Sequence, residues 1–167
     1  YLQINPWGLL PCLVLDDGTV INEAPCIFRY LETLHPEPNL LGTEPVESAH
    51  IEAWERFGEM QGMQAVGEFF RNQSEVLQNR AMPGFSGIAL IPELVERGKQ
   101  RIAWFYEQVN KRLAQSEYLG AERFTAADIT AQCVVDFGTA VGLAVPTSHS
   151  NIKRWHKAVS ERESATA

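Results

Sequence analysis

The sequence has no surplus of positive charge and no long hydrophobic run. Its 167 residues carry 14 Lys and Arg against 21 Asp and Glu, which gives a net charge of −7 at pH 7. Proteins that bind phosphate backbones or anionic membrane surfaces need clustered cations, so both kinds of binding are disfavoured. No apolar run approaches the roughly 18 residues of a membrane-spanning helix. We therefore expect neither nucleic acid nor a membrane as a partner.

Cysteine is also scarce. The three cysteines, Cys12, Cys26 and Cys133, are odd in number and widely spaced, which excludes a disulfide framework and a C-x-x-C pair. Free thiols are typical of a reducing compartment, so we expect a cytoplasmic location. The four histidines show no metal-ligand spacing with one another or with Cys or Asp, and no metal site is expected.

The chain lacks an initiator methionine, since it begins at Tyr1, and it lacks the basic-then-apolar pattern of a signal peptide. We expect that the natural N-terminus lies upstream of this residue. Hydrophobic residues make up 45% and charged residues 21%, which is typical of a folded chain rather than a disordered one. The length corresponds to one large domain or two small ones.

A β-hairpin is predicted for residues 10–21. Leu13-Val14-Leu15 is a short apolar run, Asp16-Asp17-Gly18 is a turn signal, and Thr19-Val20-Ile21 is β-branched throughout. Because the first run is continuous rather than alternating, we expect both faces of the hairpin to be buried. Cys12 would then lie inside a strand, where a buried thiol is usually inert.

A helix is predicted directly after the hairpin. Asn22 and Glu23 open it, and Pro25 suits its first turn, where the missing N–H costs nothing. His35-Pro36 ends it, because the residue before a proline is pushed out of the helical region. One apolar stripe runs along this helix, formed by Ile27, Tyr30, Leu31 and Leu34.

The junction of hairpin and helix has the chemistry of a ligand site. The helix N-terminus offers N–H groups to a carboxylate, and the carboxylate of Glu23 suits an ammonium group, so together they would hold an α-amino acid. The alternative is that Glu23 only caps the helix. Pro11, at the mouth of a strand, suggests a cis peptide bond, which would leave the backbone of Leu10 free for a ligand.

The remainder of the chain is predicted to be helical. Residues 36–46 are rich in turn-forming types and mark a linker between residues 1–35 and residues 47–167. Apolar periodicity predicts helices over residues 48–78, from Pro92 to Leu113, 129–141 and 152–159, with a loop over 81–90 and a tail over 162–167.

Glycines and methionines interrupt the first of these helices. Gly58, Gly62 and Gly67 are costly in a helix interior, so they mark a close helix contact, a bend or room for a ligand. Met60 and Met63 either fill the core or form part of a substrate surface. The residue pattern leaves these alternatives open.

A capping box begins the helix that follows residue 124. Thr125 and Asp128 have the spacing at which the hydroxyl meets the N–H of residue 128 and the carboxylate reaches back. The helix is apolar nearly all round and is therefore predicted to be buried, which makes Asp128 structural rather than catalytic. Asp136, further along this helix, needs a partner or an exposed edge.

The order and spacing of these motifs resemble those of cytosolic glutathione S-transferases, bacterial members above all. In the first domain the motifs are Asn5-Pro6-x-Gly8-x-x-Pro11-x-Leu13-x-Leu15-Asp16-Asp17-Gly18 and Glu23-Ala24-x-x-Ile27-x-x-Tyr30-Leu31. In the linker and the second domain they are Leu40-Leu41-Gly42, Phe124-Thr125-x-Ala127-Asp128-Ile129 and Asn151-Ile152-x-Arg154-Trp155-x-x-x-Val159.

The resemblance implies a two-domain fold. Residues 1–35 would be the C-terminal part of an α/β thioredoxin-like domain, namely a hairpin plus a helix. Roughly the first forty residues of that domain would be missing from this sequence. Residues 47–167 would be an all-α helical bundle. The family stabilises the glutathione thiolate with a residue near the start of the domain, so we assign no catalytic residue here, and neither Tyr1 nor Cys12 is expected to take this role.

The resemblance also implies an activity and its site. The protein would be a homodimeric detoxification enzyme that conjugates the thiolate of glutathione, its co-substrate, to a small hydrophobic electrophile. Glutathione would contact Leu10, Pro11, Glu23 and Ala24, although the family usually has Ser, which binds the γ-glutamyl carboxylate, in place of Ala24. Residues proposed to line the electrophile pocket are Trp54, Phe57, Glu59, Met60 and Met63.

Two other functions remain open. A transferase-like fold also serves as a non-catalytic protein-interaction module, and Ala24 slightly favours that alternative. The third possibility is a related glutathione-dependent peroxidase, dehalogenase or isomerase.

Overall fold

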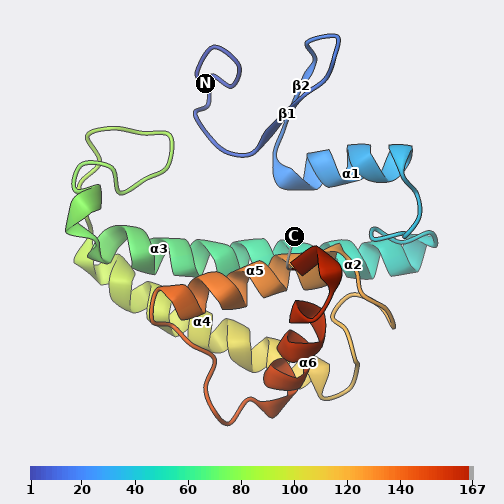
Figure 1. The fold of residues 1–167 in the computed structure, drawn as a ribbon. Helices are drawn as coiled ribbons and strands as arrows, with labels where there is room; N and C mark the ends of the chain where they lie inside the picture. Colours follow the sequence, from blue (N-terminus) through green and yellow to red (C-terminus); the bar gives the residue numbers. More distant parts are fainter. Residues whose placement is uncertain (166–167) are drawn as a thin grey trace.

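The computed structural model describes residues 1–165, which form a small hairpin-and-helix unit followed by a helical bundle (Figure 1). Strands β1 (Cys12–Val14) and β2 (Val20–Asn22) pair antiparallel, with Leu13 opposite Ile21. Helix α1 (Ala24–Leu34) follows β2 directly and contacts both strands. The predicted fold class is therefore confirmed.

The hairpin turns where the sequence predicts. Gly18 has a φ of +84°, a conformation that glycine adopts without strain, and the N–H of Leu15 donates to the carbonyl of Thr19 at 2.9 Å. The predicted burial of both faces is wrong for residues 1–165: the strand side chains are half-buried and Val14 is 48% exposed. An apolar run indicates that a strand is suited to burial, but it does not say which elements cover it.

The long helix predicted over residues 48–78 is interrupted. Helix α2 (Pro45–Phe57) continues into a π-helical segment, η1 (Gly58–Met63), and then into α3 (Gln64–Gln73). The helix begins earlier than predicted because Pro45 occupies its first turn. It ends earlier because Ser74 is extended, and the chain turns into a short 3₁₀ helix, Glu75–Leu77.

Two of the three glycines of this helix mark close helix contacts. A methyl group added at Gly58 would lie 3.0 Å from Cγ2 of Thr130, and one at Gly62 would lie 2.8 Å from Cγ1 of Val134. Both neighbours belong to the central helix, α5 (Ala126–Ala140). For the third glycine, Gly67, a methyl group would have no such neighbour within 4 Å in the described part of the chain.

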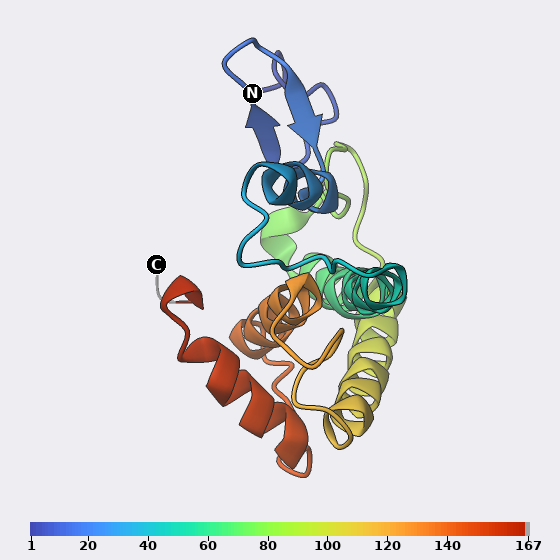
Figure 2. The ribbon, with the colours of Figure 1, turned by 90° about the vertical axis from the view of Figure 1, so that its right-hand side faces the viewer.

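The remaining helices follow the prediction closely. Helices α4 (Pro92–Leu113) and α6 (Ser150–Ser160) complete the bundle, and α5 packs against α2, η1, α3 and α6 (Figure 2). A 3₁₀ turn, Glu163–Ala165, forms part of the predicted tail, whose residues 166–167 lie outside the described residues. Buried core side chains include Ile51, Phe105, Tyr106, Val134, Ile152 and Trp155.

Asp128 is fully buried and accepts hydrogen bonds from three separate elements. Its Oδ1 accepts from the N–H of Leu119 at 3.0 Å and from Nε1 of Trp155 at 2.9 Å. Its Oδ2 accepts from the N–H of Thr125 at 3.0 Å, which completes the predicted capping box. Burial raises the pKa of Asp128, while these hydrogen bonds oppose the rise. Asp136, in contrast, is exposed and lies 2.6 Å from Nε2 of His156.

Glu55 is the second buried acid of the helical domain. It is 4% exposed, and its Oε1 has no hydrogen-bond partner among residues 1–165. Burial raises the pKa of Glu55, the carboxylates of Glu59 and Glu52 raise it further, and the guanidinium groups of Arg56 and Arg29 lower it. The folded state therefore binds a proton at Glu55 more tightly than the unfolded state does.

No helix within residues 1–165 combines the length and the hydrophobicity that crossing a membrane requires.

Replacing Asp128 with Ala should destabilise the fold strongly. The buried N–H groups of Leu119 and Trp155 would lose their acceptor, and each unsatisfied buried donor costs about 1–3 kcal/mol, so we expect a loss of at least about 2 kcal/mol. Urea denaturation measures this loss. The matched control is Asp136→Ala on the same helix, where an exposed ion pair is worth about 0–1 kcal/mol. Equal losses in the two variants would contradict the structural role of Asp128.

Replacing Glu55 with Gln should stabilise the protein in a pH-dependent way. Because the pKa of Glu55 is raised by folding, wild-type stability from this residue is full below the ordinary Glu pKa and is lost as the pH rises through the folded value. The variant should thus gain about 1–2 kcal/mol at pH 8 and little at pH 4. Denaturation at both pH values, with the exposed Glu117→Gln as control, measures the difference. A gain that is independent of pH would argue against the buried-charge explanation.

Candidate functional site

The segment before β1 is a rigid turn built on Asn5. This residue is 1% exposed; its Nδ2 donates to the carbonyl of Leu9 at 2.7 Å, and its Oδ1 accepts from the N–H of Trp7 at 3.1 Å. Gly8 completes the turn with a φ of +68° and donates its N–H to the carbonyl of Asn5 at 3.0 Å. Asn5 therefore fixes the backbone conformation of the segment that leads into Leu10. The sequence did not indicate this role for Asn5.

Leu10 follows this turn with an unpaired backbone. The Leu10–Pro11 peptide bond is cis, as expected from the sequence. Within residues 1–165 neither the N–H nor the C=O of Leu10 makes a hydrogen bond, and its side chain is 81% exposed. A ligand with an extended main chain could pair with both groups.

Glu23 stands opposite this segment in a strained conformation. It has φ 69° and ψ 128°, a region that costs a non-glycine residue about 1–3 kcal/mol. Its side chain makes no capping hydrogen bond to α1, which goes against the alternative that it only caps the helix. The chain retains an exposed carboxylate at this position despite the backbone cost.

The N-terminus of α1 offers one open amide beside Glu23. The N–H groups of Cys26 and Ile27 both donate to the carbonyl of Glu23 at 3.1 Å, whereas the N–H of Ala24 has no partner within residues 1–165. Cys12 pairs with Asn22 at the end of the hairpin, so the chain continues from this same end into Leu10 and Pro11 on one side and into Glu23 and Ala24 on the other. The four residues predicted to contact glutathione thus lie around one end of the hairpin.

The five residues predicted to line an electrophile pocket do not form one group. Trp54, Phe57 and Met63 pack against the hydrophobic core, and the rings of Trp54 and Phe57 lie 5.4 Å apart. Phe57 also stacks on the buried Phe105 at 5.5 Å. Met60 is 50% exposed. A period of three residues does not match the 3.6 residues of a helical turn, so the predicted set combines core and surface positions.

Glu59, the remaining member, forms an ion pair with Arg56 and is also influenced by the negative charge of Glu23. Burial raises the pKa of Glu59, its ion pair with Arg56 lowers it, and the negative charge of Glu23 raises it again. The carboxylate of Glu59 thus lies close enough to Glu23 for the two negative charges to interact, although Glu59 is already paired with Arg56. Within residues 1–165 no cluster of three or more His, Cys, Asp or Glu side chains could hold a metal ion.

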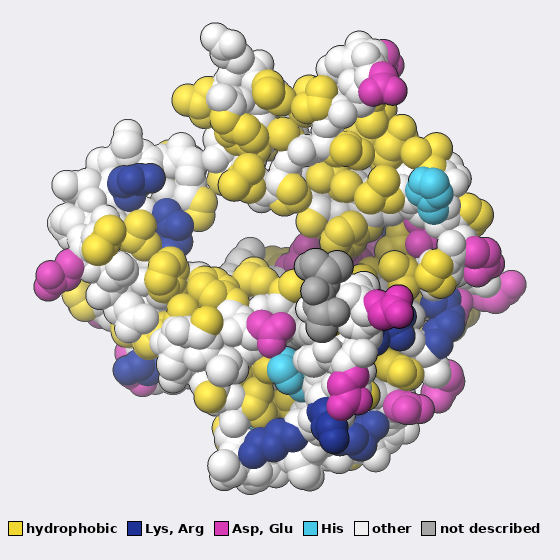
Figure 3. Space-filling view, viewed as in Figure 1, with side chains coloured by type: hydrophobic (Ala, Val, Ile, Leu, Met, Phe, Trp, Pro, Cys, Tyr) yellow, Lys and Arg dark blue, Asp and Glu magenta, His cyan; other side chains and the backbone are white. Residues whose placement is uncertain are grey.

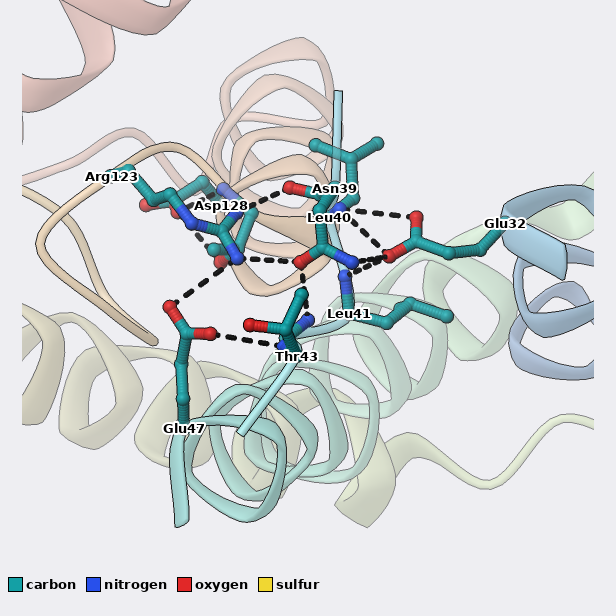
Figure 4. Close-up of polar contacts among 10 residues, drawn as sticks. Glu32, Asn39, Leu40, Leu41, Thr43, Glu47, Arg123 and Asp128 are labelled. Carbon is teal, nitrogen blue, oxygen red and sulfur yellow. Dashed lines mark hydrogen bonds and ion pairs between the residues drawn. The ribbon is translucent and has the colours of Figure 1, made fainter. Parts of the chain in front are cut away.

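A polar network fixes α1 to the helical domain (Figure 4). The carboxylate of Glu32 accepts from the N–H groups of Leu40 and Leu41 at 2.9 and 2.8 Å. Arg123 donates to the side-chain oxygen of Asn39 at 2.6 Å and pairs with Glu47 at 3.3 Å. The sequence motif 40–42 indicated the linker, but no pattern identified the side chains that bind it.

The molecule is hollowed between the N-terminal unit and the helices, and hydrophobic side chains gather on the N-terminal side of the hollow (Figure 3). Exposed apolar residues of this unit include Ile4, Trp7, Leu10 and Val14.

Comparisons with known proteins show the family of the chain. The sequence profile "Glutathione S-transferase, C-terminal domain" matches residues 66–163, and "Glutathione S-transferase, N-terminal domain" matches residues 1–34. Glutathione S-transferase 2 of Saccharomyces cerevisiae is 28% identical over 167 residues, which cover 98% of this chain and 68% of the yeast protein.

Two further relatives extend the comparison. The crystal structure of a class Gtt2 glutathione S-transferase of Vibrio parahaemolyticus is 31% identical and superimposes with a TM-score of 0.84 over 100% of this chain and 76% of that one. Elongation factor 1-gamma of Prunus avium is 30% identical over 138 residues, or 83% of this chain and 30% of that protein. On the profile matches and the structural likeness, the chain belongs to the glutathione S-transferase family.

Proposed function

We propose that the protein binds glutathione at the Leu10–Ala24 end of the hairpin and conjugates its thiolate to a small hydrophobic electrophile. The main support is Glu23, which combines a strained backbone with an exposed carboxylate beside the unpaired N–H of Ala24. Strain of this kind persists where the surrounding structure enforces it, and it clusters at ligand sites.

The groups of the site match the parts of a tripeptide. The N–H and C=O of Leu10 would pair with the cysteinyl main chain, as one strand pairs with another. The γ-glutamyl carboxylate would accept from the N–H of Ala24 at the helix N-terminus. Its ammonium group would lie by the carboxylate of Glu23, with Glu59 adding negative charge.

The chemical step needs a group that stabilises the glutathione thiolate, since a free thiol has a pKa near 8.5. We assign no residue of this chain to that role. The hydroxyl of Tyr1 already donates to the carbonyl of Leu9, and Cys12 is half-buried in β1. The contribution proposed for this chain is therefore to bind and orient the co-substrate.

Replacing Ala24 with Ser should tighten glutathione binding in the complete protein. The added hydroxyl would donate to the γ-glutamyl carboxylate, and a hydrogen bond to a charged group is worth about 1.5–3 kcal/mol, so we expect at least roughly a tenfold lower Kd. Isothermal titration calorimetry measures it. Glu23→Gln should weaken binding, and Asp17→Asn, in the exposed turn of the hairpin, should leave it unchanged. A Ser variant that binds no better would place the carboxylate elsewhere.

A non-catalytic interaction module is the second candidate. The likeness to elongation factor 1-gamma and the absence of a hydroxyl at Ala24 favour it. Retention on glutathione-agarose separates the two functions: a folded protein that is not retained would favour the module. A related glutathione-dependent peroxidase, dehalogenase or isomerase would be retained, and only substrate assays distinguish it from a transferase.

We further propose that the protein is a cytoplasmic homodimer. Exposed aromatic and apolar side chains on both units, such as Trp7, Met60 and Trp104, are suited to burial against a second copy. Sedimentation velocity of the complete protein should show the mass of two chains at micromolar concentration. A single-chain mass across that range would contradict this proposal.

A further inference from the structure

A polar cavity of about 230 Å³ lies between α1, the linker and α2 (Figure 1). Its walls include Arg29 and Thr33 of α1, Gly42 of the linker, and Ser48 and Glu55 of α2. Small-molecule sites typically measure about 300–1,000 Å³ and are mostly apolar. This cavity is smaller and is lined largely by polar side chains, so it is suited to a small polar group rather than to an apolar substrate.

Glu55 borders this cavity with a carboxylate that has no partner among residues 1–165. The side chain is 96% buried in the sense that only 4% of the residue is exposed, and its Oε1 accepts no hydrogen bond. Both neighbouring guanidinium groups are paired elsewhere, Arg29 with Glu52 at 3.6 Å and Arg56 with Glu59. Buried charges normally have a partner, because an isolated one is strongly disfavoured. Glu55 therefore presents an unsatisfied acceptor to the cavity.

The other two acids that border the cavity provide the contrast. The carboxylate of Glu32 accepts two backbone N–H groups and the side-chain amide of Asn39, all from the linker (Figure 4). Glu52 is exposed and pairs with Arg29. Among the described residues of the lining, the unsatisfied acid is thus Glu55, which is also the most deeply buried of the three.

The electrostatic field in the cavity favours a cation. Its described lining holds three carboxylates and one guanidinium, that of Arg29. Burial raises the pKa of Glu55, and the carboxylates of Glu59 and Glu52 raise it further. The guanidinium groups of Arg56 and Arg29 lower it. Because folding has already removed Glu55 from water, binding of a cation adds only the desolvation of the cation itself.

The acceptors of the cavity suit an ammonium group better than a metal ion. Within residues 1–165 no three His, Cys, Asp or Glu side chains lie close enough together to hold a metal. Two hydroxyl groups line the cavity beside Glu55. That of Thr33 donates to the carbonyl of Arg29 at 3.0 Å, which leaves its oxygen free to accept, and Ser48 contributes the second. An ammonium group has three N–H donors and no acceptor, which matches one carboxylate and two hydroxyl oxygens.

We propose that this cavity binds the ammonium group of a small primary amine, with the carboxylate of Glu55 as its counter-charge. At about 30 Å³ for each water-sized atom, the cavity holds a ligand of up to roughly seven non-hydrogen atoms. The site is separate from the proposed glutathione site, whose acid is Glu23 beside the hairpin, and does not rest on the proposed function.

The test is a titration of the complete protein with n-propylammonium chloride, followed by ¹H–¹⁵N NMR at an ionic strength kept constant with NaCl. We expect saturable shifts at the backbone amides of Gly42 and Ser48, and at least tenfold weaker binding in Glu55→Gln. This variant should fold, since it removes an unpaired buried charge. Glu117→Gln, an exposed acid outside the cavity, is the matched control and should change the affinity less than twofold.

Two further probes separate charge from shape. n-Propanol has the same carbon chain without the charge, and tetramethylammonium has the charge without an N–H donor. Both should bind at least tenfold more weakly than n-propylammonium. Equal binding of either probe would overturn the proposal, as would shifts that NaCl alone reproduces or an affinity that Glu55→Gln leaves unchanged.

The affinity should also depend on pH. The amine stays protonated below about pH 9, because a primary ammonium group has a pKa near about 10.4. Since the pKa of Glu55 is raised, at least half of its carboxyl groups are protonated at its ordinary value, and the affinity should fall at least twofold between pH 8 and pH 4.5. The residual binding of Glu55→Gln should not follow this change. An affinity of the wild-type protein that is constant over this range would overturn the role of Glu55.

A steric variant approaches the cavity from α1. Thr33 is exposed and borders the cavity, so Thr33→Trp should fill the space and weaken binding of n-propylammonium at least tenfold. Leu34→Trp is the matched control, because Leu34 is the next residue of the same helix, is exposed and does not border the cavity. Circular dichroism confirms the fold of each variant. Unchanged affinity in a folded Thr33→Trp, or equal losses in the two Trp variants, would contradict binding in this cavity.

Discussion

The position of the candidate site depends on the carboxylate of Glu32. By accepting the N–H groups of Leu40 and Leu41, it fixes the end of α1 to the linker. The carbonyl of Leu40 in turn accepts the N–H of Ala126 at 3.0 Å, at the first turn of α5. That turn is stabilised by the capping box of Asp128, so the network runs without a break from the N-terminal unit to the buried centre of the bundle.

Local chemistry made much of the fold predictable. Proline positions, the Asp-Asp-Gly turn and the capping box each act within a few residues, so the hairpin, α1, α4, α5 and α6 follow from the sequence with small shifts at their ends. Two features of the candidate site were also predictable from nearby residues. The cis bond before Pro11 and the helix start after Glu23 are local features, and the structure contains both.

Features that depend on distant partners were not predictable. Arg123 binds Asn39 across the linker, and nothing in the neighbourhood of either residue indicates the pairing. The π-helical segment depends on how closely Gly58 and Gly62 approach α5, and it alters the face on which later side chains lie. The predicted electrophile residues divide between core and surface, because a period of three residues does not follow one face of a helix that has 3.6 residues per turn.

The hairpin register has a consequence for sequence variation in relatives of this chain. Side chains alternate between the faces of a strand, so one residue inserted or deleted between β1 and β2 would alter the pairing of Cys12 with Asn22, the point from which Leu10 and Glu23 continue the chain. Substitutions in the exposed turn leave that alignment intact. The residues of the turn can therefore vary among relatives but its length cannot, and a constant length there can identify family members that keep the Leu10–Ala24 end of the hairpin.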